Sequence, residues 1–242
     1  MTVEISVVVP VKDEVENVAP LAREIASALA REPSNEIIFI DDGSSDGTGN
    51  ALRALKRELP TLRVLQHARN LGQSRAIRSG VLAARADIIV TLDGDGQNDP
   101  ADIPKVLALL RAGSAGNAVG IVSGVRATRR DTVSRRIASR LGNAIRAWLL
   151  KDGAADTGCG LKAFRRDAFL ALPYFDHLHR FLITLMLREG YEAQFVTVNH
   201  RPRAHGASKY TNFNRLLVSV TDLLGVRWLQ RRYRGKTEMR EL

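Results

Sequence analysis

Several features of secreted and membrane-spanning proteins are missing from the sequence. One cysteine, Cys159, occurs in 242 residues, so no internal disulfide can form and nothing indicates an oxidising compartment. No apolar run approaches the roughly 18 residues of a membrane-spanning helix. The first residues have no basic segment ahead of their short apolar run, so we expect no secretory signal there. These absences predict a chain that is soluble or attached to a surface.

Aromatic residues are also scarce, at 5% of the chain, and no recognition-helix or stacking-sheet motif is present. A nucleic-acid-binding module is therefore not favoured, although 36 Lys and Arg against 26 Asp and Glu give a formal charge of +10. Apolar residues make up 45% of the chain, which is typical of a globular domain and excludes a disordered or collagen-like one.

The basic residues are gathered in two stretches. Residues 201–242 hold ten Lys and Arg against three acidic residues, and residues 126–146 hold seven Arg against one. Such blocks suit partners that carry phosphate, among them nucleotides and anionic lipids, although a solvated surface gives the same pattern. One face of a helix expected at 212–232 collects apolar residues: Phe213, Leu216, Leu217, Val220, Leu224 and Trp228. That face binds a membrane surface, packs on the core or meets another subunit, and the pattern leaves all three open.

Short apolar runs alternate with helical patterns through the first half. We expect strands at 5–11, 36–40, 62–66 and 88–92, and helices at 17–31, 48–59 and 74–84. The second half is less regular, with helices expected at 133–150 and 178–189 and strands at 161–164 and 194–198. Continuous apolar strands of this kind are typical of a sheet buried on both faces. The sequence therefore predicts a doubly wound α/β fold with a mostly parallel central sheet flanked by helices.

Acidic residues follow several of these strands, where ligands bind in doubly wound sheets. Asp93 and Asp95 flank one glycine at the end of a buried strand, and carboxylates this close are tolerated when they share a cation. Their oxygens, with the amide of Gln97, suit Mg²⁺ or Mn²⁺ that holds nucleotide phosphates. An acidic turn without a metal is the alternative. Asp41 and Asp42 follow another strand and suit a base N–H, ribose hydroxyls or a shared cation.

Taken together, the motifs resemble those of a known family. Four segments of the first half resemble the signature motifs of family 2 glycosyltransferases, whose GT-A fold binds nucleotide sugars. They are Pro10–Glu14, Asp41–Thr48, Arg69–Gln73 and Asp93–Gln97. Three later segments resemble motifs of the dolichol-phosphate mannosyltransferase branch, which includes bacterial relatives that act on polyprenyl phosphate. They are Asp156–Phe164, His179–Phe181 and Arg201–Tyr210. The resemblance implies a GT-A catalytic domain at 1–210 and a basic amphipathic helix and tail at 211–242.

The resemblance also implies roles for individual residues. In the donor site it places Pro10, Lys12, Glu14, Ile40, Asp41, Asp42, Gly94, Arg135 and Ser208. The divalent ion, Mg²⁺ or Mn²⁺, would be held by Asp93, Asp95 and Gln97. The implied catalytic residues are Asp93, Asp95, Arg126, Arg203 and Lys209, with Arg136, His179 and Arg180 near the acceptor. Lys12 stands where many relatives have an aromatic residue, so a GDP-sugar and a UDP-sugar both remain open as the donor.

The implied reaction is inverting transfer of a sugar from that donor to a dolichyl or undecaprenyl phosphate. A phosphate acceptor is already ionised near neutral pH and needs no general base. The implied location is the cytoplasmic face of the membrane, where the protein is peripheral, with a membrane protein or a second copy as a further partner. Two alternatives remain: a glycosyltransferase with a non-lipid acceptor, and a sugar nucleotidyltransferase. The latter normally has a glycine-rich loop where this sequence has Pro10–Glu14.

Overall fold

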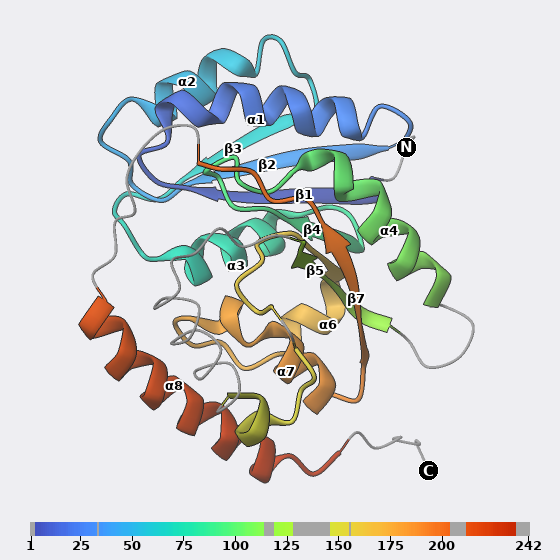
Figure 1. Ribbon diagram of the computed structural model, residues 1–242. Coiled ribbons are helices and arrows are strands. Elements are labelled where there is room, and N and C mark those ends of the chain that lie inside the picture. Colours follow the sequence, from blue (N-terminus) through green and yellow to red (C-terminus); the bar gives the residue numbers. More distant parts are fainter. Residues whose placement is uncertain are drawn as a thin grey trace, which may run out of the picture.

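The computed structural model describes residues 3–32, 34–113, 119–127, 146–154, 156–203 and 212–235, with the side chains of the last helix described from residue 220. In this part of the chain, seven strands form one sheet in the order β3-β2-β1-β4-β6-β5-β7 (Figure 1). The strands are β1 (Ile5–Val11), β2 (Asn35–Asp41), β3 (Leu62–Gln66), β4 (Ile88–Thr91), β5 (Val119–Arg126), β6 (Lys162–Arg165) and β7 (Glu192–Val198).

One strand runs against the others. β1 to β4 are parallel, and β7 is parallel to β5, but β6 lies between β4 and β5 and is antiparallel to both. All seven residues of β1 are buried, because helices cover both faces of the sheet. The carboxyl ends of β1, β2 and β4 therefore share one edge of the sheet with the amino end of β6.

The helices form two layers around the sheet. One face is covered by α1 (Val15–Ala28), α2 (Thr48–Leu55) and α4 (Ile103–Ala112), the last preceded by the 3-10 turn η1 (Pro100–Asp102). The other face is covered by α3 (Gln73–Ala83), α6 (Arg166–Leu170), the 3-10 turn η3 (Leu178–Arg180), α7 (Leu182–Arg188) and α8 (Asn212–Arg232). None of the described helices has the combined length and hydropathy that a membrane span requires.

The predicted α/β class and mostly parallel sheet are confirmed, and the strand at 62–66 and the helix at 212–232 have the predicted bounds. The single helix expected at 178–189 is wrong in detail, because Phe181 interrupts it and leaves η3 and α7 as separate turns. α4, β5 and α6 were not predicted. Of the helix expected at 133–150, only 146–150 lies within the described residues, and it is helical there.

Candidate active site

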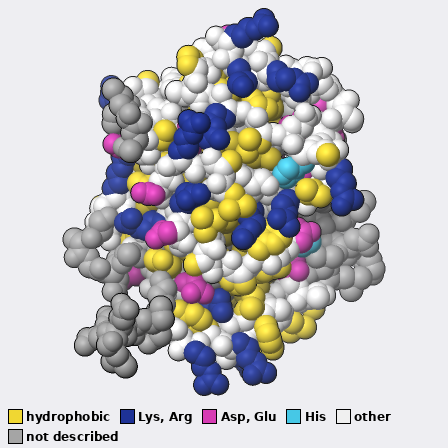
Figure 2. Space-filling model, turned by 180° about the vertical axis from the view of Figure 1, so that it is seen from behind, with side chains coloured by type: hydrophobic (Ala, Val, Ile, Leu, Met, Phe, Trp, Pro, Cys, Tyr) yellow, Lys and Arg dark blue, Asp and Glu magenta, His cyan; other side chains and the backbone are white. Residues whose placement is uncertain are grey.

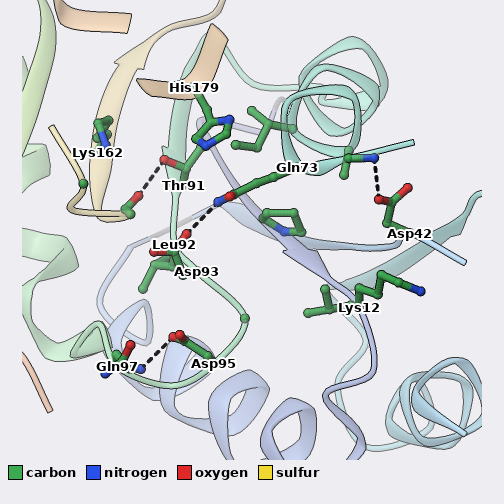
Figure 3. A pocket seen from close by; sticks show the side chains of 18 of the residues that line it. Lys12, Asp42, Gln73, Thr91, Leu92, Asp93, Asp95, Gln97, Lys162 and His179 are labelled. Atoms are coloured by element: carbon green, nitrogen blue, oxygen red, sulfur yellow. Dashed lines mark hydrogen bonds between the residues drawn. The ribbon is translucent and has the colours of Figure 1, made fainter. Parts of the chain in front are cut away.

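A cavity of about 720 Å³ opens at the sheet edge where the strand ends meet. Eleven of the residues predicted for the site line it: Pro10, Lys12, Glu14, Asp42, Asp93, Gly94, Asp95, Gln97, His179, Arg180 and Arg203. In Figure 3, Lys12 and Asp42 lie at one side of the cavity, His179 and Lys162 at the other, and Asp93 between them. The sheet topology thus brings together motifs that are far apart in the sequence.

Three predicted residues within the described chain do not line the cavity. Ile40 is fully buried in the core beneath α3. The Asp41 carboxylate accepts hydrogen bonds from the Ser44 N–H and the Gln66 amide, both at 2.9 Å, and so stabilises the turn after β2. Arg126 donates two hydrogen bonds of 2.7 Å to Asp156. Burial alone would lower the pKa of Arg126, but its contacts with Asp156 outweigh burial and raise it. Arg135, Arg136, Ser208 and Lys209 lie outside the described residues.

Asp93 and Asp95 form the acidic part of the cavity wall. Asp93 Oδ1 accepts a hydrogen bond of 2.8 Å from Gln73 Nε2, and Asp95 Oδ1 accepts one of 3.1 Å from the Gln97 N–H (Figure 3). Burial, together with the negative charge of Asp95, raises the pKa of Asp93 to about 6. A partly buried carboxylate beside a second one is therefore held here at an energetic cost.

Gly160 gives the Asp93 carboxylate its room. A Cβ at this position would lie 2.3 Å from Asp93 Oδ2 and 2.6 Å from Asn98 Oδ1, which is closer than any van der Waals contact allows. The Gly160 carbonyl also accepts a hydrogen bond of 2.9 Å from Thr91 Oγ1, so the loop before β6 is held against the end of β4. The absence of a side chain in this loop is what lets Asp93 reach the cavity wall.

Lys162, the first residue of β6, is a buried cation in the same wall. Its ammonium group donates hydrogen bonds to the carbonyls of Cys159 and Thr157. Burial lowers the pKa of Lys162, while the nearby Cys159, Asp93 and Asp156 oppose that shift. Lys162, Gln73 and Thr91 were not among the predicted site residues, although the first two lie in motifs that carried the family resemblance.

At the other side of the cavity, Asp42 organises the loop that follows β3. Its two carboxylate oxygens accept hydrogen bonds from the N–H groups of Leu71 (2.9 Å) and Gly72 (2.8 Å), and His67 Nδ1 lies 2.7 Å from Oδ1. These bonds fix the start of α3, where Gln73 points to Asp93. Lys12 donates a hydrogen bond of 3.1 Å to the Gly43 carbonyl, which holds the turns after β1 and β2 together.

His179 is a neutral hydrogen-bond donor in the cavity. The Ser74 hydroxyl oxygen accepts the His179 backbone N–H at 3.2 Å and lies 2.7 Å from His179 Nδ1. The Ser74 hydroxyl can donate its proton to Nδ1, and in the tautomer with that pairing the ring hydrogen is on Nε2. Burial, assisted by the positive charges of Lys162 and Arg180, lowers the pKa of His179 to about 3. At pH 7 the ring can donate to an anion without carrying a charge.

Arg203 lies across the cavity rim from these groups. It donates a hydrogen bond of 2.7 Å to Glu14 Oε1, and its guanidinium is 3.7 Å from Asp95 Oδ2. The segment before it is anchored by Arg201, whose guanidinium contacts Glu24 at 2.7 Å and Asp99 at 2.6 Å. A cation therefore stands beside both the Asp95 carboxylate and the residues that follow β1.

The fit of the cavity to a divalent cation can be judged from its ligands. The described residues contain no group of three or more His, Cys, Asp or Glu side chains arranged around a metal. The negative charge of Asp95 disfavours ionisation of Asp93, and Gln97 directs its amide nitrogen toward the Arg201 carbonyl at 3.4 Å. Two carboxylates and an amide oxygen fit a hard cation such as Mg²⁺ or Mn²⁺.

The cost of ionising Asp93 leads to a stability prediction. Without added metal, Asp93→Asn is expected to raise the free energy of unfolding by up to about 3 kcal/mol at pH 8, since the pKa rises from 3.8 to about 6 and each unit is worth about 1.4 kcal/mol. A carboxyl whose pKa is raised by folding destabilises the native state at pH values above that raised pKa. It has no effect below the pKa of the unfolded chain, so the stability gain of Asp93→Asn vanishes near pH 4. Thermal unfolding of both proteins from about pH 4 to 8 measures this difference. Equal unfolding temperatures at pH 8 would contradict it.

The sequence was compared with known proteins. A family model described as glycosyl transferase family 2 matches residues 6–172. A dodecaprenyl-phosphate galacturonate synthase of Rhizobium johnstonii is 33% identical over 95% of this chain and 68% of its own. An undecaprenyl-phosphate 4-deoxy-4-formamido-L-arabinose transferase of Yersinia enterocolitica is 34% identical over 91% of this chain and 66% of its own. The chain thus spans about two thirds of the length of these relatives.

Solved structures share the fold. Glucosyl-3-phosphoglycerate synthase from Mycobacterium tuberculosis, solved with Mn²⁺ and UDP-glucose, matches with a TM-score of 0.69 at 18% identity over 94% of this chain and 79% of that one. A mannosyltransferase from Pyrobaculum calidifontis, solved with GDP-mannose and Mn²⁺, matches with a TM-score of 0.66 at 20% identity over 98% and 66%. These matches confirm the predicted fold class, including its GT-A type.

Proposed function

The chain belongs to glycosyltransferase family 2, and from this membership we propose that it moves a sugar from a nucleoside diphosphate to a polyprenyl phosphate, with inversion at the anomeric carbon. One observation carries the proposal. A single cavity holds a carboxylate pair, Asp93 and Asp95, and on its other side the donors His179 and Arg180. Such a cavity can hold two anionic reactants together, one through a cation bound by the two carboxylates and the other on His179 and Arg180.

The donor half lies at the ends of β1 and β2. Pro10, Lys12, Glu14 and Asp42 form the wall in which the base and ribose would be held. The two solved relatives carry UDP-glucose and GDP-mannose respectively, which supports a nucleotide sugar but leaves the base open. Lys12 has no ring to stack on the base, and its ammonium is engaged with the Gly43 carbonyl. We therefore keep both UDP- and GDP-sugars as donors.

Asp93, Asp95 and Gln97 would hold the donor's divalent cation, Mg²⁺ or Mn²⁺. When bound, such a cation neutralises charge on the diphosphate, both in the donor and in the leaving nucleoside diphosphate. Gln73 orients the Asp93 carboxylate from behind by its hydrogen bond of 2.8 Å. Lys162 adds a fixed positive charge on the same wall, in a buried position where it needs no reorganisation during the reaction.

The acceptor half lies at η3. The phosphate monoester attacks the anomeric carbon with one of its ionised oxygens, and the bond from that carbon to the donor diphosphate breaks. The acceptor arrives deprotonated, so the step needs no general base. His179, in the tautomer with its ring hydrogen on Nε2, and Arg180 would donate hydrogen bonds to the acceptor phosphate. Arg203, at the rim beside Glu14 and Asp95, would approach the phosphates of the donor.

Two observations favour a lipid acceptor over a soluble one. The relatives that are 33–34% identical bear names that specify dodecaprenyl or undecaprenyl phosphate. A hydroxyl acceptor would also require a general base, whereas Asp93 and Asp95 in the cavity wall are the carboxylates suited to the cation. The reaction would then take place at the cytoplasmic face of the membrane, with the protein held there peripherally. The sugar nucleotidyltransferase alternative is not retained, because family membership makes the chain a glycosyltransferase.

Thermal stabilisation by nucleotide sugars tests the donor half. A UDP- or GDP-sugar with Mn²⁺ is expected to raise the unfolding temperature, since a ligand at 100 times its Kd adds about 2.7 kcal/mol to the stability of the native state. ADP-glucose serves as the control nucleotide. Transfer of labelled sugar to undecaprenyl phosphate, compared with 3-phosphoglycerate, then tests the acceptor. Stabilisation by no nucleotide sugar, or transfer to phosphoglycerate alone, would contradict the proposal.

A further inference from the structure

The outward face of α8 is apolar and exposed. Val220, Leu224 and Trp228 follow one another at intervals of four residues, which places them in one row along the helix. Their exposed fractions are 50%, 60% and 57%. The opposite side of α8 meets the core through the buried Val226 and its neighbour Leu229. The described part of the apolar face predicted from the sequence is therefore the face turned away from the core.

The charges around this face are basic. Between residues 220 and 235 the arginines are Arg227, Arg231, Arg232 and Arg234. Asp222, the single acidic residue of that stretch, is turned inward, with its carboxylate 3.0 Å from His177 Nδ1. The Arg232 guanidinium lies 5.8 Å from the centre of the Trp228 ring, so cation and aromatic ring share the surface. An apolar row among arginines is complementary to a surface that is apolar inside and anionic outside.

A second exposed tryptophan stands close to the end of α8. Trp148 is 77% exposed in the helical segment 146–150. That segment is held to α8 by a hydrogen bond of 2.9 Å from Gln230 Nε2 to the Leu150 carbonyl, and Figure 1 shows it beside the C-terminal end of the helix. Trp148 and Trp228 are the two tryptophans of the chain. Large amphipathic rings of this type concentrate where a protein meets a lipid headgroup layer.

The inner side of the same helix adjoins the candidate active site. Asp222, on the inner side of α8, contacts His177 and lies 4.0 Å from Arg180, which lines the cavity. Figure 2 shows the back of the molecule, where Lys and Arg side chains are scattered among apolar patches and acidic side chains.

Building on the proposed function, which requires a lipid acceptor, we propose that the outward face of α8, formed by Val220, Leu224 and Trp228 with Trp148 beside it, binds an anionic lipid bilayer. A second copy of the chain is a poorer occupant, because a two-fold contact through this face would bring its arginines against each other. The bilayer brings the acceptor phosphate to the side of the molecule at which Arg180 lines the cavity. The face thereby couples membrane attachment to acceptor entry.

Tryptophan fluorescence and vesicle sedimentation test the proposal. The native chain is expected to sediment with phosphatidylcholine vesicles that contain phosphatidylglycerol, with a blue shift of tryptophan emission, and to bind pure phosphatidylcholine at least tenfold more weakly. Leu224→Glu is expected to weaken binding to the anionic vesicles at least tenfold. The matched control is Leu82→Glu, at a leucine that is 53% exposed at the far end of α3, and it is expected to bind as the native chain does.

Three outcomes would overturn the proposal: no binding of the native chain to anionic vesicles, equal losses in Leu224→Glu and Leu82→Glu, or a native dimer that Leu224→Glu converts to a monomer without any vesicle binding. The test is separate from that of the proposed function. Stabilisation by a nucleotide sugar with Mn²⁺, measured without vesicles, is expected to be the same in Leu224→Glu and the native chain. Vesicle binding without sugar transfer would count against the proposed function but would still support membrane binding by α8.

Discussion

Replacing Asp95 with asparagine is expected to lower the rate of sugar transfer by about 10³-fold or more while the protein remains folded. Asparagine keeps an oxygen that can accept the hydrogen bond of the Gln97 N–H, so the local turn is preserved. What it removes is a negative charge at the wall where the donor's cation would be held. The loss of one preorganised electrostatic group costs about 10²–10³ in rate, and loss of a metal ligand adds to that.

The measurement is transfer of labelled sugar into the lipid fraction over a range of Mn²⁺ concentrations. Asp167→Asn is the matched control, because Asp167 also accepts a backbone hydrogen bond, from the Ala168 N–H, but lies at the opposite end of β6 from the cavity. It is expected to transfer sugar within about twofold of the native rate. If Asp95→Asn stayed within tenfold of the native rate, with unchanged Mn²⁺ dependence, the proposed metal role would be wrong.

The first half of the fold is predictable because its signals are local. β1, β2 and β4 contain short apolar runs rich in β-branched residues, since both faces of the sheet are covered. β5 escaped prediction because Gly120 and Gly124 interrupt its apolar pattern. A Cβ at Gly120 would lie 2.5 Å from the Tyr191 side chain, and one at Gly124 would lie 2.8 Å from that of Val198. Both positions need glycine because β7 and the residue before it, Tyr191, pack closely against β5. Contacts between segments so far apart in the sequence leave no local pattern.

Adjacent residues at one strand end need not share a site. Asp41 and Asp42 are neighbours after the same buried run, and the sequence alone placed both in the donor pocket. Successive side chains of a strand point to opposite faces, so Asp42 lines the cavity while Asp41 faces α2, where a Cβ at Gly49 would lie 2.7 Å from its Oδ2. The sequence pattern predicts that an acidic pair ends this strand. It does not predict which of the two side chains faces the cavity.

Lys162 was missed for a topological reason. In a parallel sheet the functional residues follow each strand, and the sequence was searched on that basis. β6 is antiparallel, so its first residue, not the residues after its last, lies at the same edge, and Lys162 pairs with Thr91 at the end of β4. The position of β6 between β4 and β5 is a property of the whole sheet. Gln73 was missed because the direction of its amide depends on the loop before α3. Asp42, which is distant in the sequence, holds that loop in place.

The second large effect is expected at this lysine. Lys162→Met should lower the transfer rate by about 10²–10³-fold, because it removes a buried positive charge that acts on Asp93 and on the phosphates brought to the same wall. Methionine has a similar length and tolerates an apolar setting, so the core around β6 can close over it. Lys105→Met is the matched control, since Lys105 also donates to a backbone carbonyl, that of Thr197 at 2.6 Å, but its side chain is exposed on the outer side of α4.

A charge effect and a structural effect of Lys162 can be separated. The ammonium group also holds the loop before β6 through the carbonyls of Cys159 and Thr157, so Lys162→Met is expected to lose some stability as well. Lys162→Arg keeps the charge and the donors, and if charge is the cause it should transfer sugar at least tenfold faster than Lys162→Met at equal donor saturation. If both variants lost stability alike while their transfer rates stayed near the native value, Lys162 would serve only to hold the loop. The Asp93 carboxylate would then be stabilised by the cation and by the hydrogen bond from Gln73, without a contribution from Lys162.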